Sequence, residues 1–535
     1  MTEASNHQEK HQSLHHENQQ LRKQVVQFQE QIMQLQQRVA WFEKQLFGRK
    51  SEKRIIDNPK QTKLFEWLGE AAPKPQDEKK QTVTYERGTQ NKRRGNDCET
   101  ECGLRFNADV PVETIRLDPP ELQGEHADQY EVIDTKVTHK LAQRPASYVV
   151  LRYERPVIKE KQDKSHNQTL ITAPMLPQVL DNSLADVSFL VGLLCDKFIY
   201  HLPLYRQHQR LQHAGITLAR STLTNLVAKV SELLRPIVAV QLRHILQSKI
   251  LAMDETPIKA SRKSKGNMKQ AWFWPLYGED DEVVFTYSES RGRLHIENLL
   301  KTEFTGTLLS DGHSAYASYV ATENKKEEAN AITAAQCWVH TRRKFVEAET
   351  MTPEDVDHVL NGIAALYEIE KQISTKKLTG DKKKQVRLEC SKPIVDQLFQ
   401  WGEDQLNRLD LTPSHPLRKA INYLLKRRAE LSVFIADPDL PLDTNHLERT
   451  LRCIPMGRKN WLFCWTELGA EHVGIIQSLL TTCKLHDVNP WVYLTDVLQR
   501  ISIHPNSQIE ELTPRRWKTL FADDPMTCIL DIGRQ

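Results

Sequence analysis

Two short apolar runs that each end in an aspartate constrain the fold of this chain most. Asp254 follows Ile250–Met253, and Asp311 follows Thr307–Ser310 and precedes Gly312. Short apolar runs bounded by polar residues are typical of buried strands. Because neighbouring parallel strands end at the same edge of a sheet, we expect the two carboxylates to meet there. For either residue alone, the alternative is a solvated strand end or a simple Asp-Gly turn.

Strand-like runs recur between Lys249 and Glu347. They are Ile250–Met253, Ala271–Tyr277, Glu282–Tyr287, Thr307–Ser310 and Ala334–Val339, with a helix expected at Leu294–Leu300. Three meandering strands, a helix, a strand, a helix and a final strand predict a mixed α/β sheet of the ribonuclease H-like type. From about Met351 to Asp437 the pattern is helical almost throughout, and helices resume after Glu448.

Glu448 is the third acid of interest. It lies in a polar, helix-like stretch and shares one helical face with Asn445 and Arg452, at spacings of three and four residues. With the two aspartates it could form a cage of oxygen ligands that suits magnesium or manganese, and a cation is needed to keep such mutually repelling acids ionised. Two such ions support phosphodiester chemistry. The alternatives are an ion pair of Glu448 with Arg452, and Glu471 as the third acid.

The pair Cys337-x-x-His340 is expected to end the last strand, close to these acids. It leads into the cations Arg342, Arg343 and Lys344. A zinc half-site needs two further ligands, and none follows at suitable spacing. We therefore expect His340 to position DNA or the acids rather than to bind zinc.

A second cationic segment, Gly457–Trp461, follows Glu448 and contains Arg458 and Lys459. Together with Arg449 and Arg452 it offers phosphate-binding cations and an aromatic surface for base stacking, although Trp461 could instead be a core residue. The net charge of +3 is too small to establish a nucleic-acid partner by itself. The position of the cations near the acids is therefore the stronger signal.

A heptad pattern marks the N-terminal segment. Its apolar positions are Leu21, Val25, Phe28, Ile32, Leu35, Val39, Phe42 and Leu46. This pattern predicts a coiled coil through which protomers associate, and the alternative is one amphipathic helix docked on its own chain. A polar linker and a small β-rich module follow. Cys98 and Cys102 precede that module without a second ligand pair, so we do not expect structural zinc.

Two helices around a glycine turn are expected after the β-rich module. The first spans about 202–211, a break comes at His213-Ala214-Gly215, and a second short helix begins near Ser221. The pair resembles a DNA-binding helix-turn-helix, in which Arg206 and Arg220 would contact DNA. An ordinary helical hairpin that packs on a neighbour fits the pattern equally well.

Composition excludes several other classes of protein. No run of about 18 apolar residues appears, so a membrane span is not expected. The first 20 residues form no apolar signal segment. The nine cysteines follow no regular pairing, which favours a reducing cytoplasm over a disulfide framework.

These residues carry a resemblance to a known family. The chain resembles the DDE transposases of the insertion-sequence-66 family, the large TnpC-type proteins, over most of its length. The matching motifs are Leu46–Lys53, His201–Gln207, Arg220–Leu223, Met253–Thr256, Ser310–Gly312, Cys337–Phe345, Leu442–Arg449, Gly457–Phe463 and Pro490–Arg500.

The resemblance implies roles for particular residues. Asp254, Asp311 and Glu448 would be the metal-binding triad, with Cys337 and His340 as the C-x-x-H signature beside it. It also implies an all-helical insertion before the glutamate, and association with small accessory proteins of the same element.

The chain departs from the family pattern at three places. The usual cysteine-rich zinc-binding module, with paired C-x-x-C sites, is missing. Thr444 stands where a second Asn is common, and Cys464-Trp465 replaces a Gly-Ser pair.

The resulting hypothesis is a bacterial, cytoplasmic and nucleoid-associated DNA transposase. It would bind the terminal inverted repeats of its element as an oligomer and cut with water activated by two Mg²⁺ or Mn²⁺ ions. The freed 3′-hydroxyl would then attack target DNA. The alternatives are a catalytically decayed repressor that binds the element, and a ribonuclease H-like nuclease that cuts without joining.

The expected domains follow from these patterns. They are a coiled-coil helix (1–50), a linker (51–95), the β-rich module (96–165), the helix-turn-helix-like segment (166–240), the first part of the core (241–347), the helical insertion (348–436), the last part of the core with Glu448 (437–500) and a tail (501–535).

Overall fold

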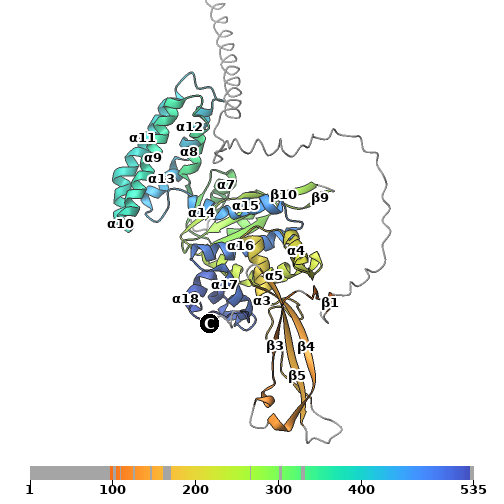
Figure 1. Ribbon diagram of the computed structural model, residues 1–535. Coiled ribbons are helices and arrows are strands. Elements are labelled where there is room, and N and C mark those ends of the chain that lie inside the picture. Colours follow the sequence, from red (N-terminus) through yellow and green to blue (C-terminus); the bar gives the residue numbers. More distant parts are fainter. Residues whose placement is uncertain are drawn as a thin grey trace, which may run out of the picture.

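The computed structural model describes most of the chain from residue 97 onward (Figure 1). The described residues are 97–99, 104–108, 110–123, 127–144, 147–160, 170–264, 267–300, 304–326 and 332–530. The expected coiled coil, the linker, Cys102 and the side chain of Cys98 lie outside this part, so those predictions stay predictions.

A six-stranded mixed sheet forms the centre of the molecule. Its strands are β8 (Ile250–Met253), β9 (Thr256–Ser264), β10 (Asn267–Tyr277), β11 (Val283–Ser288), β12 (Thr307–Ser310) and β13 (Thr333–Gln336). The order is β11-β10-β8-β12-β13, with β9 paired to β10. β8, β12 and β13 run parallel, whereas β10 is antiparallel to β8, β9 and β11. Every residue of β8 and β12 is buried, which explains the apolar sequence of β8 and the two leucines at the centre of β12.

Two strand predictions were wrong. β9 was not expected, because its sequence is mostly polar; Thr256, Ile258 and Ala260 alternate into the core. The last strand ends at Gln336 rather than Val339, and Trp338 already begins a helix. The reason is the fully buried Trp338 ring, whose indole N–H donates to the Leu431 carbonyl at 3.0 Å. The C-x-x-H pair therefore lies on the first turn of a helix and not at the end of a strand.

Helix α16 (Glu467–Leu485) covers the open edge of the sheet at β11. The backbone N–H of Phe285 donates to the Ser478 hydroxyl at 2.9 Å, and that of Val283 donates to the Thr482 hydroxyl at 3.2 Å. Gly474 permits this approach, since a β carbon there would lie 2.5 Å from the Phe285 carbonyl oxygen. The helix thus satisfies strand groups that would otherwise be left unpaired.

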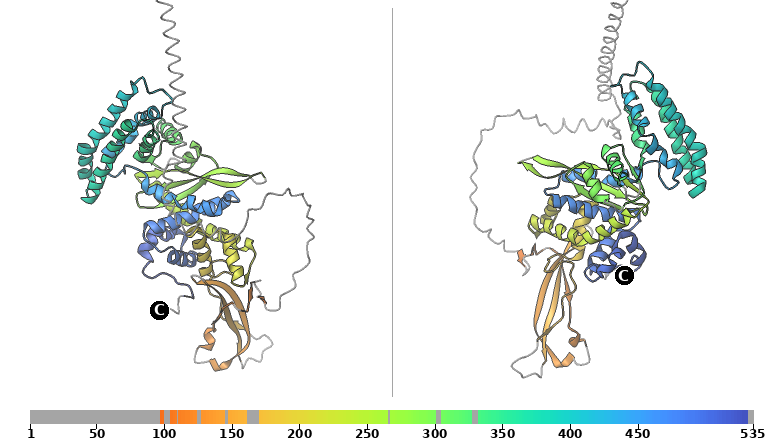
Figure 2. Two further views of the ribbon diagram at one scale, coloured as in Figure 1. Left: turned by 45° about the horizontal axis from the view of Figure 1, so that its top comes forward. Right: turned by 180° about the vertical axis from the view of Figure 1, so that it is seen from behind.

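The expected helical segment before Glu448 is present and lies at one end of the molecule (Figures 1 and 2). Its helices are α8 (Trp338–Val346), α9 (Pro353–Thr375), α10 (Gly380–Val386), the π-helical turn η3 (Arg387–Ser391), α11 (Lys392–Leu406), α12 (Pro416–Leu425) and α13 (Arg428–Ala436). Helices α6 (Arg293–Leu300) and α7 (Ser314–Glu323) flank the parallel strands.

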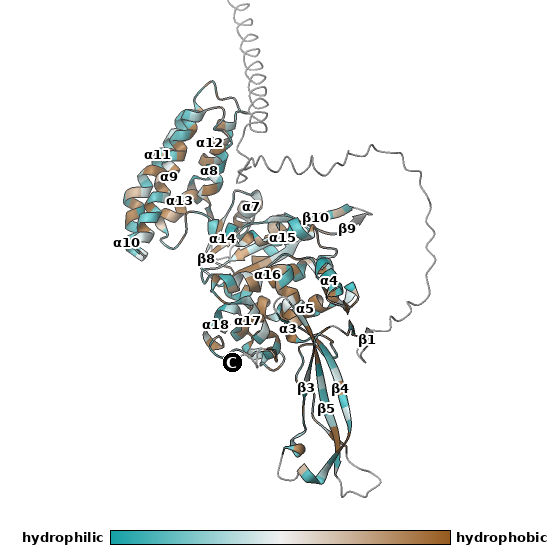
Figure 3. Cartoon of the chain, viewed as in Figure 1, coloured by the Kyte–Doolittle hydropathy of each residue, from teal (hydrophilic) through white to brown (hydrophobic). Residues whose placement is uncertain are grey.

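The strands expected between about 103 and 160 are also present, and they form an arm at the other end (Figures 1 and 2). The arm consists of β3 (Val112–Arg116), β4 (Tyr130–Arg144), β5 (Ser147–Glu160) and β6 (Ile171–Thr172), with short helical turns η1 (Pro120–Leu122) and η2 (Ala127–Gln129). A second small sheet joins β1 (Asp97–Glu99), β2 (Arg105–Asn107) and β7 (Ile216–Thr217). Figure 3 shows that the arm is largely hydrophilic, whereas α16 in the body is mostly apolar.

The helix pair after the arm differs from the prediction in length. A further helix, α3 (Val187–Phe198), precedes the pair and was not predicted. α4 (Leu204–His213) and α5 (Arg220–Leu246) are separated as expected, and Gly215 takes a positive φ of 79° in the turn. However, α5 has 27 residues and is not short. Apolar residues continue at helical spacing and bury its second half in the core.

The C-terminal part is helical. It comprises α14 (Asn445–Leu451), α15 (Cys453–Trp461), α16, α17 (Pro490–Arg500), η4 (Asn506–Leu512) and α18 (Pro514–Leu520). Among the described residues, no helix combines the length and the apolar character that a membrane crossing requires.

A buried arginine connects several helices of the insertion through hydrogen bonds. The side chain of Arg387 is fully buried, and its Nε and one terminal nitrogen donate to the two Glu370 carboxylate oxygens, both at 2.8 Å. The other terminal nitrogen donates to the carbonyls of Phe434 and Asp437, at 2.7 and 2.8 Å. This one guanidinium links α9, η3 and the end of α13.

We predict that Arg387→Met destabilises the insertion by about 3 to 5 kcal/mol, because it leaves a carboxylate and two carbonyls without their donor. Hydrogen exchange along α9–α13, together with the thermal midpoint, measures the effect. Lys392→Met is the matched control: its pair with Asp396 is exposed on both sides, so the change should cost less than about 1 kcal/mol. Equal effects of the two substitutions would contradict this account.

Candidate active site

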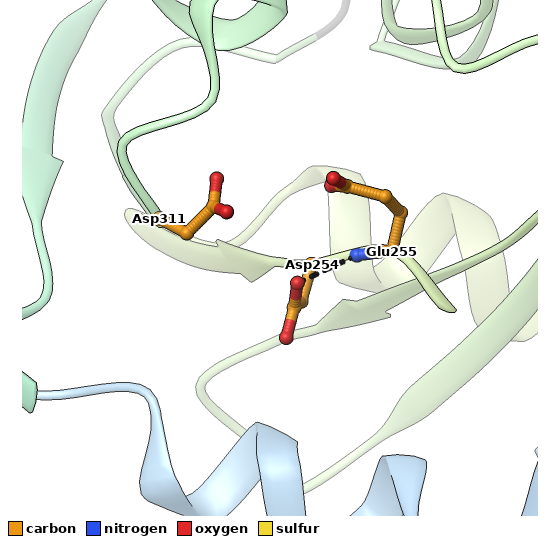
Figure 4. A group of neighbouring side chains, drawn as sticks. All are labelled: Asp254, Glu255 and Asp311. Atoms are coloured by element: carbon orange, nitrogen blue, oxygen red, sulfur yellow. Dashed lines mark hydrogen bonds between the residues drawn. The ribbon is translucent and has the colours of Figure 1, made fainter. Parts of the chain in front are cut away.

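The two aspartates meet at the carboxyl edge of the parallel strands. β8 and β12 pair through Ala252 and Leu309, so Asp254 and Asp311 leave neighbouring strand ends. Asp254, Glu255 and Asp311 each place an oxygen within 4.8 Å of the others (Figure 4). Asp254 accepts the N–H of Glu255 at 2.7 Å, and Asp311 accepts that of His313 at 2.8 Å.

Glu255 is the acid that sequence reasoning missed. Its side chain is only 1% exposed, and both of its oxygens are occupied. One accepts the Arg291 Nε–H at 2.7 Å, and the other accepts the Tyr316 hydroxyl at 2.7 Å. The sequence signal that could have identified Glu255 as a site residue is its position directly after Asp254. Its partners come from the start of α6 and from α7, which no local pattern connects to it.

Glu448 lines the same cavity as the aspartates. Four carboxylates, four cations, two histidines and a tyrosine contribute to the walls of this space of about 590 Å³; they are Asp254, Glu255, Asp311, Glu448, Arg291, Arg343, Lys344, Arg452, His313, His340 and Tyr423. Glu448 is not among the three acids that lie within 4.8 Å of one another. The three acids proposed from the sequence therefore line one cavity.

The carboxylates oppose each other's ionisation. Burial raises the pKa of Asp254 to about 7, and the charges of Glu255, Asp311 and Glu448 act in the same direction. The hydrogen bond from the Glu255 N–H opposes this rise only in part. Near neutral pH, Asp254 is thus poised between its charged and neutral forms, and a nearby cation would favour the charged form.

His340 lies beside Glu448. Its Nε2 is 3.7 Å from a Glu448 oxygen, and burial lowers the pKa of His340 although Asp311 and Glu448 act to raise it. The other ring nitrogen, Nδ1, and that Glu448 oxygen are buried without a hydrogen-bond partner. Buried polar atoms of this kind are available to a ligand.

Cys337 connects the two elements that carry Asp311 and Glu448. Its backbone N–H donates to the Ser310 carbonyl at 3.2 Å, and its Sγ accepts the Thr444 N–H at 3.3 Å. Ser310 precedes Asp311, and Thr444 begins α14. The buried thiol thus joins the end of β12 to the helix of the glutamate.

The insertion packs against the cavity at Gly312. A β carbon on this glycine would lie 2.1 Å from the Tyr423 hydroxyl oxygen, which belongs to α12. Arg427 donates to the Gly312 carbonyl at 2.9 Å, and its guanidinium lies 3.7 Å from the centre of the Tyr423 ring. The Asp311 turn is therefore held directly against the insertion.

The remaining residues proposed from the sequence are not in the walls of this cavity. Asn445 donates its amide to Asp443 at 2.6 Å, and Glu471 pairs with Arg235 at 3.1 Å. The cations outside the walls are Arg342 on α8, Arg449 on α14, Arg458 and Lys459 on α15, Arg206 on α4 and Arg220 at the start of α5. Arg458 donates to the Pro257 carbonyl, and the other five are exposed. Their proposed contacts with DNA stay predictions.

Comparison with known proteins adds an independent finding. Residues 182–472, more than half of the chain, match the family described as Transposase IS66 family. Residues 478–515 match the IS66 C-terminal element, and residues 34–115 match the region described as Transposase C of IS166 homeodomain.

Relatives of similar length occur in Sinorhizobium fredii. The uncharacterized protein y4hP is 31% identical over 353 residues, which cover 63% of each chain. The uncharacterized protein y4jD is 29% identical over 381 residues, covering 69% of this chain and 73% of that protein. The match thus spans a little under two thirds of y4hP. By the match over residues 182–472, this chain belongs to the IS66 family of transposases.

Proposed function

We propose that the chain is a DDE-type transposase that binds the ends of its insertion sequence and catalyses metal-dependent cleavage and joining of DNA strands. One observation carries the proposal. Two aspartates from adjacent parallel strands and a glutamate from a later helix line one cavity that cations also border. The acids suit metal ions, and the cations suit phosphates.

The sheet supports this assignment. Three antiparallel strands followed by two parallel ones, in the order β11-β10-β8-β12-β13, support the proposal of a ribonuclease H-like core. The carboxyl ends of β8 and β12 are the edge at which such a sheet would present its acids.

The donor set fits divalent metal ions. Crowded carboxylates, the raised pKa of Asp254 and the unpartnered Glu448 oxygen all favour a cation in the cavity. Asp254, Asp311 and Glu448 would hold magnesium or manganese, because hard oxygen ligands are what these ions prefer. When bound, the ions would supply an activated attacking oxygen and stabilisation of the leaving oxygen.

Other residues would hold the DNA in place. Arg343, Lys344 and Arg452 can bind phosphates on either side of the scissile bond. Arg291 is committed to Glu255, so its charge stabilises the acid cluster rather than DNA. His340 would orient Glu448 from 3.7 Å away.

Recognition of the element's ends would fall to other segments. The region 34–115 that matches the homeodomain description, and the exposed Arg206 and Arg220, are the proposed contacts. The heptad segment would pair protomers, and small proteins of the same element would join the assembly.

We predict that Asp254→Asn lowers strand cleavage by about 100-fold or more while end binding stays unchanged, because the amide removes a charged oxygen ligand. A cleavage-and-joining assay with magnesium, on DNA that carries the element's terminal repeats and with a target plasmid, measures this. Glu471→Gln, outside the cavity, should cleave normally. Cleavage by Asp254→Asn at the wild-type rate would refute the catalytic assignment. Binding without cleavage by the wild type would favour a repressor, and cleavage without joining a nuclease.

We also predict that manganese binding tightens as pH rises from about 6 to 8. The pKa of Asp254 is raised to about 7, so below that pH a proton occupies the carboxylate and competes with the metal ion. Electron paramagnetic resonance of free manganese gives the affinity at each pH. The Asp254→Asn protein should bind more weakly and with less dependence on pH. An affinity that is flat across this range in the wild type would contradict the prediction.

A further inference from the structure

Four exposed apolar side chains gather in one short segment at the α15–α16 junction. The exposed fractions are 51% for Met456, 62% for Leu462, 64% for Trp465 and 51% for Leu468. We call these residues the junction patch. Single exposed apolar residues are ordinary, but a group of them marks a surface for interaction.

The backbone of the patch is strained. Leu462 has φ 63° and ψ −49°, and the Phe463 N–H donates across it to the Trp461 carbonyl at 2.7 Å. This is the rarer form of γ-turn, which is costly for a residue with a β carbon. The surrounding structure must therefore stabilise a turn that exposes leucine.

A strand contact provides that stabilisation. The Cys464 N–H donates to the Lys259 carbonyl at 2.9 Å, and its carbonyl accepts the Ser261 N–H at 3.1 Å, both in β9. Cys464 is buried, so in extended backbone the next side chain, Trp465, points to the opposite side. The Phe463 ring packs edge-on against the indole, with centroids 5.0 Å apart. Trp465 is thus exposed yet held in place.

The patch continues from the cavity of the acids. Arg452 lines that cavity, and Met456 and Lys459 follow it at spacings of four and three residues on one helical face. From Arg452 to Trp461 a helix rises by about 13 Å, or about four nucleotides of one DNA strand. Between 452 and 468 three cations, Arg452, Arg458 and Lys459, stand against one acid, Glu467. This charge favours DNA over an apolar protein partner.

We propose that Trp465, supported by Leu462, stacks on a base of the DNA strand that enters the cavity, a few nucleotides away from the scissile phosphate. The inference rests on the proposed function, since it needs DNA in that cavity. An indole fixed in advance loses little conformational freedom on stacking, and its π face accepts any base. Trp465 would hold a locally unstacked nucleotide and so set the position of the strand.

Photocrosslinking tests the proposal with the full chain. End DNA carries iodouracil at one position at a time, counted from the scissile phosphate. We expect a crosslink to Trp465 that is restricted to a narrow window of neighbouring positions, away from the scissile phosphate itself. Trp465→Phe should keep end binding, whereas Trp465→Ala should bind about tenfold more weakly. Ile503→Ala, which alters an equally exposed apolar residue at 66%, is the matched control and should change nothing.

The outcomes separate this proposal from the one it rests on. A chain that binds and cleaves end DNA, but gives no crosslink to Trp465 and is unaffected by Trp465→Ala, overturns the stacking proposal alone. A chain that binds no end DNA overturns the proposed function. If Trp465→Ala changes the oligomer mass in light scattering and leaves DNA binding intact, the patch is a contact between copies, and the stacking proposal is wrong.

Discussion

The close grouping of carboxylates at the ends of β8 and β12 is the constraint on which the rest of the site depends. Arg291 balances the charge of Glu255, Tyr316 donates a hydrogen bond to it, and Asp311 accepts one backbone N–H. Asp254 gains only the Glu255 N–H, which does not compensate its burial. A cation near Asp254 would offset this burial and favour the charged form of the carboxylate.

The insertion acts as structural support for this edge. It holds the Asp311 turn through Tyr423 and Arg427, and it buries the Trp338 ring at the start of α8. Cys337 then connects β12 to α14 by two hydrogen bonds. Glu448 consequently reaches the cavity through a chain of packed contacts, although 137 residues separate it from Asp311. Residues that touch no DNA would thus set the distance between the acids.

Much of the fold was predictable because it repeats locally. Short runs with apolar centres indicated β8 and β12, and helical spacing indicated the insertion. β9 was missed because a polar hairpin strand has little apolar alternation. The end of β13 was predicted too late in the chain because an apolar residue such as Trp338 fits a strand and a helix equally well. The hydrogen bond of Trp338 to Leu431 connects it to a distant helix, which local sequence does not reveal.

The amino-acid sequence by itself determined where the aspartates stand, at the ends of runs that must be buried, and that a helix carries Glu448. Only the tertiary structure decided that Glu255 is paired with Arg291, that Glu448 lines the same cavity as the aspartates, and that Trp465 is exposed. The physical reason is the separation along the sequence between the residues that interact. Periodicity reports which face of one element is apolar, whereas these features depend on partners from distant segments that packing brings together.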